Sequence, residues 1–439
     1  MNINKRSQMS NNYDDLGLFL DTTRSSGLHI EEALMGLVTL SVIAKENPNN
    51  FHELCDIESK NQKELFFDII KKNKFLEKYE LDRCLIPAMQ SASADALEKL
   101  VAYVNNVTNF NKFADELIYA FQKSASKEFE FSITDQVVVE IIKGIIGDTS
   151  QLTIYDGAAG LCSLTSQMTS KKLLLEDVNS KFVAIGKCIL FLKDIDAEYN
   201  LANSLTSNKK SVNADLVVTQ APWGVRFTPN DVEKIKESKY IQLKDKMEIP
   251  TSANDSLWIQ HSLYHLNQNG RAIMLMPQGW LFRGGYDAEL RNYLLESDLV
   301  EAVIGLPPRL LKNTMIPTVL LIFSKNKLNK NIVHFIDASH FGSEVKRQLQ
   351  LSKNEITLIA NLVSGCVTES PYCRAIPVSE IRENNNNLSI SCYFGGDVKW
   401  KKYDLTHETK LLEKAQQNFS SANKKLMDLL ADQISSDFV

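Results

Sequence analysis

Short apolar runs alternate with amphipathic helical segments through the middle of the chain, and this alternation limits the possible folds more than any other feature. The runs are rich in β-branched residues or leucine and lie at 152–155, 173–175, 216–218, 272–276, 299–304 and 319–323. Strands that alternate with helices are typical of a parallel, doubly wound sheet. The last two runs are joined by a loop too short for a helical crossover, so we expect this sheet to end in an antiparallel strand.

The segments on either side of these runs follow other patterns. From Leu16 to about Phe121, apolar residues recur every three or four positions, which predicts helices. We therefore predict an all-α domain over 1–123, an α/β domain over 124–335 and a mixed region over 336–439. A further strand-like run lies at 332–336, and the mixed region closes with a charged helical run at 406–434, which is typical of a helix that pairs with a partner.

Composition narrows the possible classes of protein. The chain of 439 residues is longer than a domain with a single hydrophobic core usually is, so two or more structural units are expected. No apolar run approaches the roughly 18 residues that span a bilayer, and the polar N-terminus lacks the apolar core of a signal peptide, which predicts a cytoplasmic location. The cysteines form no Cys-x-x-Cys pair and no cluster with histidine, which argues against a metal site. With a net charge of −5, a local basic patch or a partner must provide any attraction to DNA.

The loops after the predicted strands are the places to look for a ligand site, because open parallel sheets bind ligands beyond the carboxyl ends of their strands. The first run is followed by Asp156-Gly157-Ala158-Ala159-Gly160-Leu161-Cys162, whose small residues allow a ligand close to the backbone. The second run ends in Glu176, twenty residues after Asp156, where a carboxylate can bind ribose hydroxyls. The third is followed by Gln220-Ala221-Pro222-Trp223-Gly224. Each loop alone is more commonly a structural turn, but the combination indicates a nucleotide-like cofactor.

These loops resemble, in order and spacing, those of the adenine-N6 DNA methyltransferases, and specifically the modification subunit of type I restriction-modification systems. The likeness covers nearly the whole chain and is most specific over 270–325. It extends to 18–45, 129–141 and 382–393. The resemblance implies a Rossmann-like, S-adenosylmethionine-dependent methyltransferase sheet with an all-α N-terminal domain and a C-terminal helical tail.

The resemblance also implies roles for individual residues. In this family an Asn-Pro-Pro-aromatic motif binds the adenine amine through the Asn side chain and the next backbone carbonyl, and its aromatic residue stacks on a base flipped out of the duplex. The catalytic positions here are Gln220, Ala221, Pro222 and Trp223. The implied contacts to S-adenosylmethionine are Phe131, Ile133, Asp156, Gly160, Cys162, Glu176 and Asn203.

Five places in the sequence, one of them a pair of adjacent residues, depart from the family pattern. Cys162 replaces a glycine, so its side chain is expected to project toward the cofactor, and a positive φ there would cost about 1 kcal/mol. Asn203 replaces an acid, and Ile133-Thr134 replaces Thr-Pro. Gln220 carries its amide on one extra methylene, a displacement of about 1 Å that can cost roughly a hundredfold in rate. Ala221 lacks the fixed φ of proline.

The departures fall on ligand-facing positions, whereas the scaffold stretch 270–325 fits the family well. We interpret the chain as a modification-subunit homologue that is catalytically impaired or inactive and acts as a binding or scaffolding subunit of a DNA-modification or defence complex. In this interpretation Trp223 and Phe227 fill the pocket, and Cys162 and Ile133 close it. The alternative is an active adenine-N6 DNA methyltransferase that works with a specificity subunit. A protein glutamine methyltransferase fits less well, because the regions flanking the α/β domain resemble the DNA-acting subunit.

The expected partners follow from the same resemblance. They are DNA, reached through a complex, and a second protein that resembles a specificity subunit or another methyltransferase. Arginines on the predicted loop face are candidates for phosphate contacts; they are Arg226, Arg283, Arg291 and Arg309.

Overall fold

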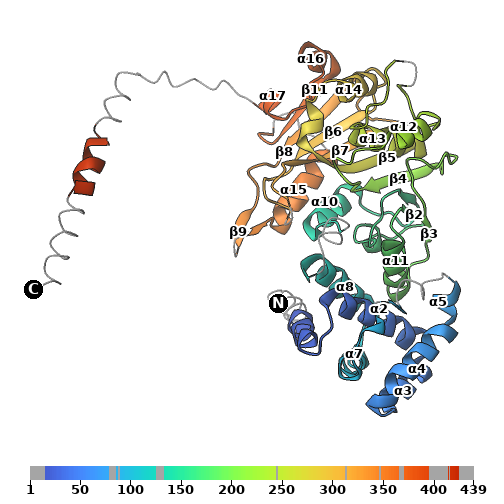
Figure 1. Cartoon of the computed structure of the whole chain (residues 1–439). Coiled ribbons are helices and arrows are strands. Elements are labelled where there is room, and N and C mark those ends of the chain that lie inside the picture. The colour runs from blue at the N-terminus through green and yellow to red at the C-terminus, as the bar shows by residue number, and fades with distance from the viewer. Residues whose placement is uncertain are drawn as a thin grey trace, which may run out of the picture. The chain divides into compact units, whose positions relative to one another are not determined.

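The computed structural model divides the chain into two units, Met1–Phe394 and Gly395–Val439 (Figure 1). The described residues are 15–78, 86–87, 89–124, 133–243, 246–311, 314–345, 348–364, 370–394, 414 and 416–424. In the second unit, 416–424 is helical. The rest of the helical run predicted at 406–434 lies outside the described residues, apart from position 414.

The N-terminal part of the first unit is helical, as predicted, and the described residues before 125 form no strand. Its labelled helices are α2 (Ile30–Glu46), α3 (Pro48–Asp56), α4 (Ser59–Lys72), α5 (Lys74–Lys78), α7 (Ala94–Asn105) and α8 (Phe110–Ser124). Helix α2 is central, because α3, α7 and α8 all contact it and nearly all of its side chains are buried. Ser93 caps α7 by accepting a hydrogen bond from the Ala96 N–H, and Asn47 caps α3 in the same way through the Asn50 N–H.

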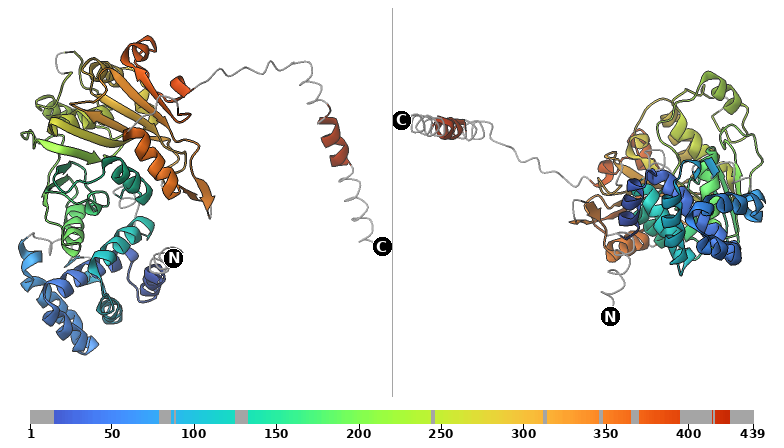
Figure 2. Two further views of the ribbon diagram at one scale, coloured as in Figure 1. Left: turned by 180° about the vertical axis from the view of Figure 1, so that it is seen from behind. Right: turned by 60° about the horizontal axis from the view of Figure 1, so that its bottom comes forward.

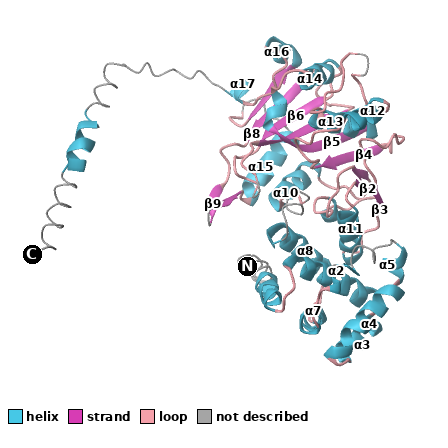
Figure 3. Ribbon diagram, in the orientation of Figure 1, coloured by secondary structure: helices cyan, strands magenta, loops and turns pink. Residues whose placement is uncertain are grey.

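A mixed sheet forms the rest of the unit (Figure 3). Among the described residues it has nine strands, in the order β11-β8-β6-β7-β5-β4-β1-β2-β3. They are β1 (Thr153–Asp156), β2 (Lys172–Asp177), β3 (Glu198–Leu201), β4 (Ala214–Thr219), β5 (Leu266–Pro277), β6 (Val300–Gly305), β7 (Thr318–Ser324), β8 (Ile332–Asp337) and β11 (Cys373–Pro377). All pair in parallel except β7 and β11, which confirms the predicted doubly wound α/β fold.

The antiparallel strand that was predicted at the end of the sheet exists but lies elsewhere. Strand β7 runs antiparallel to both β5 and β6 and occupies the space between them, so it is an interior strand. The edge strands β3 and β11 were not predicted. Each of them has two or fewer buried side chains, so neither leaves an apolar run in the sequence.

Helices cover both faces of the sheet because neighbouring residues along a strand point to opposite sides. On one face, Val217 and Met274 pack with α13 (Asn254–His265) and α14 (Tyr286–Glu296). On the other, Val218 and Leu275 pack with α10 (Gln136–Ile146) and α15 (Lys353–Ser364). The remaining short elements are η1 (Thr165–Gln167), α12 (Pro229–Lys236), η2 (Gln278–Leu281), α16 (Val378–Glu383), α17 (Ser391–Phe394) and the hairpin β9 (Ser343–Val345) and β10 (Gln348–Gln350).

The helical part and the sheet are joined through α11 (Ser180–Leu192), which contacts α2 and α8 (Figure 2). Lys45 on α2 donates hydrogen bonds to the carbonyls of Phe191 and Leu192 at 3.0 and 2.9 Å. Lys193 Nζ lies 2.6 Å from Asp115 Oδ1 on α8. The predicted domain boundaries remain a prediction, although β11 shows that the sheet continues beyond residue 335.

In the described part of the chain, no single helix is both long and apolar enough to cross a membrane, although one bent pair, Asp15–Ser25 with Ile30–Glu46, reaches that length and composition together.

Candidate functional site

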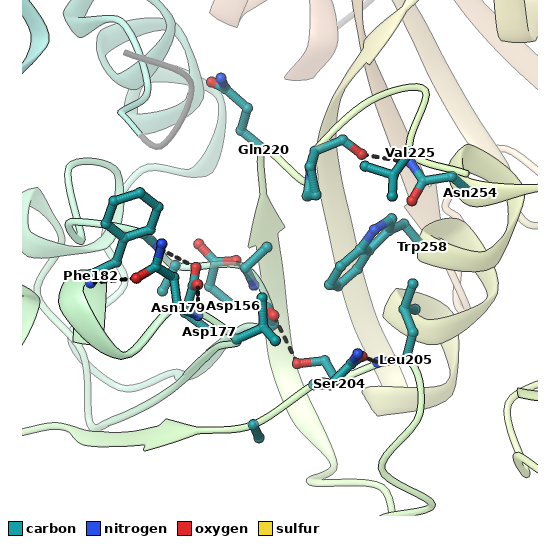
Figure 4. Close-up of a pocket in the computed structure, with 18 of the residues that line it drawn as sticks. Asp156, Asp177, Asn179, Phe182, Ser204, Leu205, Gln220, Val225, Asn254 and Trp258 are labelled. Atoms are coloured by element: carbon teal, nitrogen blue, oxygen red, sulfur yellow. Dashed lines mark hydrogen bonds between the residues drawn. The ribbon is translucent and has the colours of Figure 1, made fainter. Parts of the chain in front are cut away.

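A cavity of about 330 Å³ lies beyond the carboxyl ends of β1, β2 and β4 (Figure 4). The chain runs from β1 outward through β2 and β3 and then returns to β4 on the other side of β1. The cavity therefore lies at the point where the strand order reverses, which is where ligands bind in folds of this type. Its wall includes Asp156 to Gly160, Asp177 to Asn179, Phe182, Ala202 to Leu205, Thr134, Gln220, Pro222, Val225, Phe227, Asn254 and Trp258.

The backbone N–H groups of the loop after β1 donate hydrogen bonds that hold the loop against the end of β2. Asp156 Oδ1 accepts from the Ala158 N–H at 3.0 Å, and the Ala159 N–H donates to the Glu176 carbonyl at 2.9 Å. The Gly160 N–H donates to Asp177 Oδ2 at 2.9 Å, with Gly160 in the left-handed region at φ +52°. Asp156 is buried, and desolvation raises the pKa of its carboxyl to about 7.

The structure places Asp177, and not Glu176, in the wall of the cavity. Glu176 is buried on the other side, where its Oε1 lies 2.5 Å from Lys209 Nζ and its Oε2 lies 2.7 Å from Ser204 Oγ. Adjacent residues at the end of a strand face opposite ways, so one acid points into the cavity and its neighbour away. The sequence offers both acids at the end of one run and no signal that chooses between them.

Cys162 lies in the left-handed region with φ +60°, so the cost considered for a positive φ at this position applies. Its side chain does not face the cavity, however, so the expectation that it projects toward a cofactor is wrong. Sγ instead packs in the apolar core beside Gly186, where a Cβ would lie 3.0 Å from it. Burial raises the pKa of the Cys162 thiol well above its usual value, so the thiol is neutral.

The segment before α10 also differs from expectation. Ile133 is 3% exposed and packs in the core of the helical region, outside the cavity that it was expected to close. Thr134 lines the cavity in its place, and its N–H donates to Ser163 Oγ at 2.8 Å. A threonine is therefore present one position later than the resemblance suggested. Phe131 lies outside the described residues.

Asn203 lies in the cavity wall, as expected for a residue that contacts the cofactor. Its Oδ1 accepts from the N–H groups of Leu205 and Thr206 at 3.2 and 3.3 Å, so the side-chain oxygen closes its own turn.

The turn after β4 is divided between cavity and core. Gln220 and Pro222 line the cavity, whereas Ala221 is 3% exposed and packs in the core. The side-chain amide of Gln220 points away from Asp156 and Trp258, and its Oε1 is buried with no hydrogen-bond partner among the described residues (Figure 4). Trp223 lies outside the cavity and donates from its indole N–H to the Leu275 carbonyl at 3.1 Å. The expectation that Trp223 fills the pocket is therefore wrong, whereas Phe227, which was expected to fill it as well, lies in the cavity wall.

Several residues that line the cavity were missed by sequence reasoning. Asn179 caps α11 by accepting from the N–H groups of Lys181 and Phe182 at 2.9 and 3.4 Å, and Phe182 forms part of the wall. Asn254 and Trp258 come from α13, where their spacing of four residues places them on one face. The spacing could have predicted that the two side chains share a helix face, but nothing in the sequence showed that this face meets the turn after β4.

The arginines proposed for phosphate contacts have different environments. Arg291 is 2% exposed and donates to the carbonyls of Trp280 and Arg283 at 2.6 and 2.7 Å, and burial lowers its pKa to about 10. It is a structural residue, so its predicted role is wrong. Arg283 pairs with Asp255 and, at 2.9 Å, with Asp287. Arg226 and Arg309 are exposed and remain candidates.

The wall combines a carboxylate, amides and flat apolar surfaces, which suits a ligand with a ribose and a heterocycle. Its volume is within the range of small-molecule sites, about 300–1,000 Å³. Among the described residues, no group of three or more His, Cys, Asp or Glu side chains is arranged to hold a metal ion.

Comparisons with known proteins agree with this geometry. Residues 110–402 match the family model described as N-6 DNA Methylase. The methylase subunit of the type I restriction enzyme MpnII from Mycoplasma pneumoniae is 25% identical over 378 residues, which cover 81% of this chain and 68% of that protein. The MjaVIII methylase subunit from Methanocaldococcus jannaschii is 28% identical over 247 residues, covering 55% of this chain and 41% of that protein.

Solved structures show the same fold. The methyltransferase subunit of a type I restriction-modification system from Streptococcus thermophilus superposes with a TM-score of 0.67 at 20% identity, over 87% of this chain and 98% of that chain. A chain from a study of complex assembly in a type I restriction-modification system superposes with a TM-score of 0.68 at 15% identity, over 97% and 99%.

Proposed function

Because the chain belongs to the N-6 DNA methylase family, we propose that it is the methylase-type subunit of a type I restriction-modification-like complex, which binds S-adenosylmethionine but transfers its methyl group to adenine poorly. The observation that supports this proposal is the contrast within one cavity. The end formed by β1 and β2 is open, whereas the Gln220 amide at the end of β4 is turned away from it.

The cofactor end has suitable groups for each part of S-adenosylmethionine. Asp177 would accept hydrogen bonds from the ribose hydroxyls, and Asn203 and Phe182 would contact the adenine. The small residues from Gly157 to Gly160 would allow the methionine portion close to the backbone, next to the carboxyl of Asp156. When bound, the cofactor supplies an electrophilic methyl group on its sulfonium. The sequence changes at Cys162 and Ile133 lie outside this wall and would not obstruct it.

The transfer end lacks a correctly placed acceptor on Gln220. An exocyclic amine conjugated to a purine is a weak nucleophile, so its hydrogens must be bound by carbonyl oxygens that direct its lone pair toward the methyl group. The extra methylene of Gln220 and the missing proline at Ala221 loosen this arrangement, and a misplacement of about 1 Å can cost roughly a hundredfold in rate. We propose that the subunit therefore contributes mainly binding and scaffolding to its complex.

The complex would contain DNA and a second protein that resembles a specificity subunit or another methylase, and it would act in the cytoplasm. The exposed Arg226 and Arg309 are candidates for contacts with DNA phosphates.

A second candidate function is that of an active adenine-N6 methyltransferase that works with a specificity subunit. It is supported by the buried Gln220 Oε1, which has no hydrogen-bond partner among the described residues. An unsatisfied buried oxygen costs about 1–3 kcal/mol, so rotation of this side chain toward an amine would be favoured.

Single-turnover methyl transfer to adenine-containing duplex DNA distinguishes the two functions. The protein is tested with its co-purifying subunits, as wild type and as the Gln220→Asn/Ala221→Pro variant. Under the proposal, the wild type is slow and the double variant is faster by roughly a hundredfold. Measurable transfer by the wild type at a rate equal to that of the double variant would favour the second function.

A further inference from the structure

The turn after β4 has little torsional constraint of its own. Pro222 fixes one φ, but the residue before it is Ala221, and Gly224 lies in the left-handed region at φ +64°. The position of the turn therefore depends on contacts with neighbouring elements. One of these contacts is at its end, where the Phe227 N–H donates to the Thr251 carbonyl at 2.9 Å.

The start of α13 provides a second contact, in the middle of the turn. Asn254 is the first residue of this helix and is 2% exposed. Its Nδ2 donates to the Pro222 carbonyl at 2.6 Å and to Asp255 Oδ1 at 3.2 Å (Figure 4). A carbonyl and a carboxylate only accept hydrogen bonds, so the amide must turn its NH2 group toward both of them. The side chain of Asn254 thus has one orientation, in which it bridges the helix and the turn.

This bridge is held from its outer side by Arg283. One carboxylate oxygen of Asp255 accepts from Asn254 and the other pairs with the Arg283 guanidinium. The Asp255 side chain is 4% exposed, whereas that of Arg283 is 44% exposed and also pairs with Asp287 on α14 at 2.9 Å. A continuous series of hydrogen bonds therefore runs from the half-exposed Arg283 through Asp255 and Asn254 to the Pro222 carbonyl.

We propose that Asn254 is a positioning residue for methyl transfer. It acts through the backbone of the turn, where the Ala221 carbonyl occupies the position of the family's second acceptor for the adenine amine. The ring of Pro222 joins this carbonyl to the one that Asn254 holds, so fixing one limits the movement of the other. The bond from Asn254 thereby replaces part of the constraint that a proline at 221 would supply. Because it assigns Asn254 to the transfer end of the cavity, this role rests on the proposed function.

Asn254→Asp tests this role with a side chain of the same size. The variant replaces a donor by an acceptor that faces two other acceptors, the Pro222 carbonyl and the Asp255 carboxylate. Hydrogen exchange of the full-length protein, followed by mass spectrometry from milliseconds onward, compares the N–H groups of 220–227 with those of 259–265 in α13. We expect exchange in the turn to become about tenfold faster, the effect of one hydrogen bond, while exchange in α13 is unchanged.

Two other variants separate a local effect from general destabilisation. Asn267 Nδ2 donates to Asp215 Oδ1 at 2.7 Å at the start of β5, so Asn267→Asp also sets a carboxylate against a carboxylate, but away from the turn. This matched control should leave exchange in the turn unchanged. Arg283→Gln removes the outer partner of Asp255 and should make exchange in the turn about threefold faster. It tests the same series of hydrogen bonds if Asn254→Asp unfolds.

Methyl transfer separates positioning from cofactor binding. In a Gln220→Asn background, adding Asn254→Asp should lower the single-turnover rate roughly tenfold and leave the Kd for S-adenosylhomocysteine unchanged. Adding Ala221→Pro should then restore part of the rate, because the proline ring fixes the same part of the turn. If the Gln220→Asn background transfers no methyl group, the proposed account of Gln220 fails, and the exchange measurements still decide the role of Asn254.

Three results of the exchange measurements would overturn the proposed role. The first is equal exchange in the turn of the wild type and of Asn254→Asp, including a wild-type turn that already exchanges as fast as an unstructured peptide. The second is an equal acceleration in the turn and in α13, which would show that Asn254 stabilises the helix alone. The third is a turn that is loosened as much by Asn267→Asp, which would indicate general destabilisation.

Discussion

The two adjacent acids at the end of β2 allow a sharp test of the site. Asp177→Asn and Glu176→Gln make the same chemical change one residue apart, yet the structure predicts different consequences for them. Asp177 lines the cavity, whereas Glu176 pairs with Lys209 at 2.5 Å outside it. We expect the first variant to weaken cofactor binding and the second to leave it unchanged.

The magnitudes follow from the interactions that each change removes. A hydrogen bond to a charged group contributes about 1.5–3 kcal/mol, so Asp177→Asn should raise the Kd for the cofactor roughly 10- to 150-fold. In the wild type, Asp177 Oδ2 accepts from the Gly160 N–H and Oδ1 accepts from the Asn179 N–H, so the single oxygen of the variant keeps one of these two bonds. The free energy of unfolding is therefore measured beside the Kd, to separate a loss of stability from a loss of binding. Glu176→Gln loses an ion pair whose Lys209 side chain is 44% exposed, so solvent screening limits the loss in unfolding free energy to about 1 kcal/mol.

Calorimetric titration with S-adenosylhomocysteine gives the Kd, and urea unfolding gives the free energy of unfolding. S-adenosylhomocysteine is used because it cannot transfer a methyl group, so the titration reports binding alone. If Glu176→Gln weakened binding and Asp177→Asn did not, our placement of the ribose-binding carboxylate would be refuted.

Three further predictions concern single residues. The pKa of Asp156 is raised from 3.8 to about 7, so between these values the folded protein binds a proton that the unfolded chain releases. The stability that this group contributes therefore falls as pH rises from about 4 to about 7. Urea unfolding across this range should show this slope in the wild type, and a slope that persists in Asp156→Asn would contradict the assignment. Cys162→Gly removes a backbone strain of about 1 kcal/mol but also removes a packed side chain, so Tm should change little. The Kd for S-adenosylhomocysteine should change little as well. A tenfold gain in affinity would show that the thiol obstructs the cofactor. Arg291→Met should lower the free energy of unfolding by about 3 kcal/mol, because it leaves buried carbonyls unpaired. Arg309→Ala should leave the free energy of unfolding unchanged and weaken DNA binding by the assembled complex. Urea unfolding and DNA filter binding measure the two effects, and the opposite pattern would reverse the roles of the two arginines.

The sequence was sufficient for the architecture because the central strands are buried on both faces. All six predicted runs and the strand-like run at 332–336 became strands, and the order of the runs along the chain predicted the doubly wound sheet. In the nine-stranded sheet, the strands that escaped prediction, β3 and β11, lie at the edges, where burial is low and no apolar run is required. The place of β7 inside the sheet depends on which neighbours its backbone pairs with, and short-range patterns do not encode this choice.

The candidate site was predictable at the level of loops but not of side-chain directions. The loop after β1 and the turn after β4 were correctly expected to lie together, because the carboxyl ends of parallel strands share one edge. Which acid of β2 faces the cavity depends on the phase of the strand. The directions of Cys162 and Trp223 depend on packing partners, Gly186 and Leu275, that are distant in sequence. For the same reason, the sequence did not predict that α13 lines the cavity.

The central claim is that this altered subunit still has a usable cofactor site. Calorimetric titration of the full-length protein with S-adenosylmethionine tests it most directly. We predict binding of one molecule per chain with a Kd in the micromolar range, on the order of −8 kcal/mol. The absence of any binding heat at millimolar cofactor, confirmed by an unchanged Tm, would contradict the account.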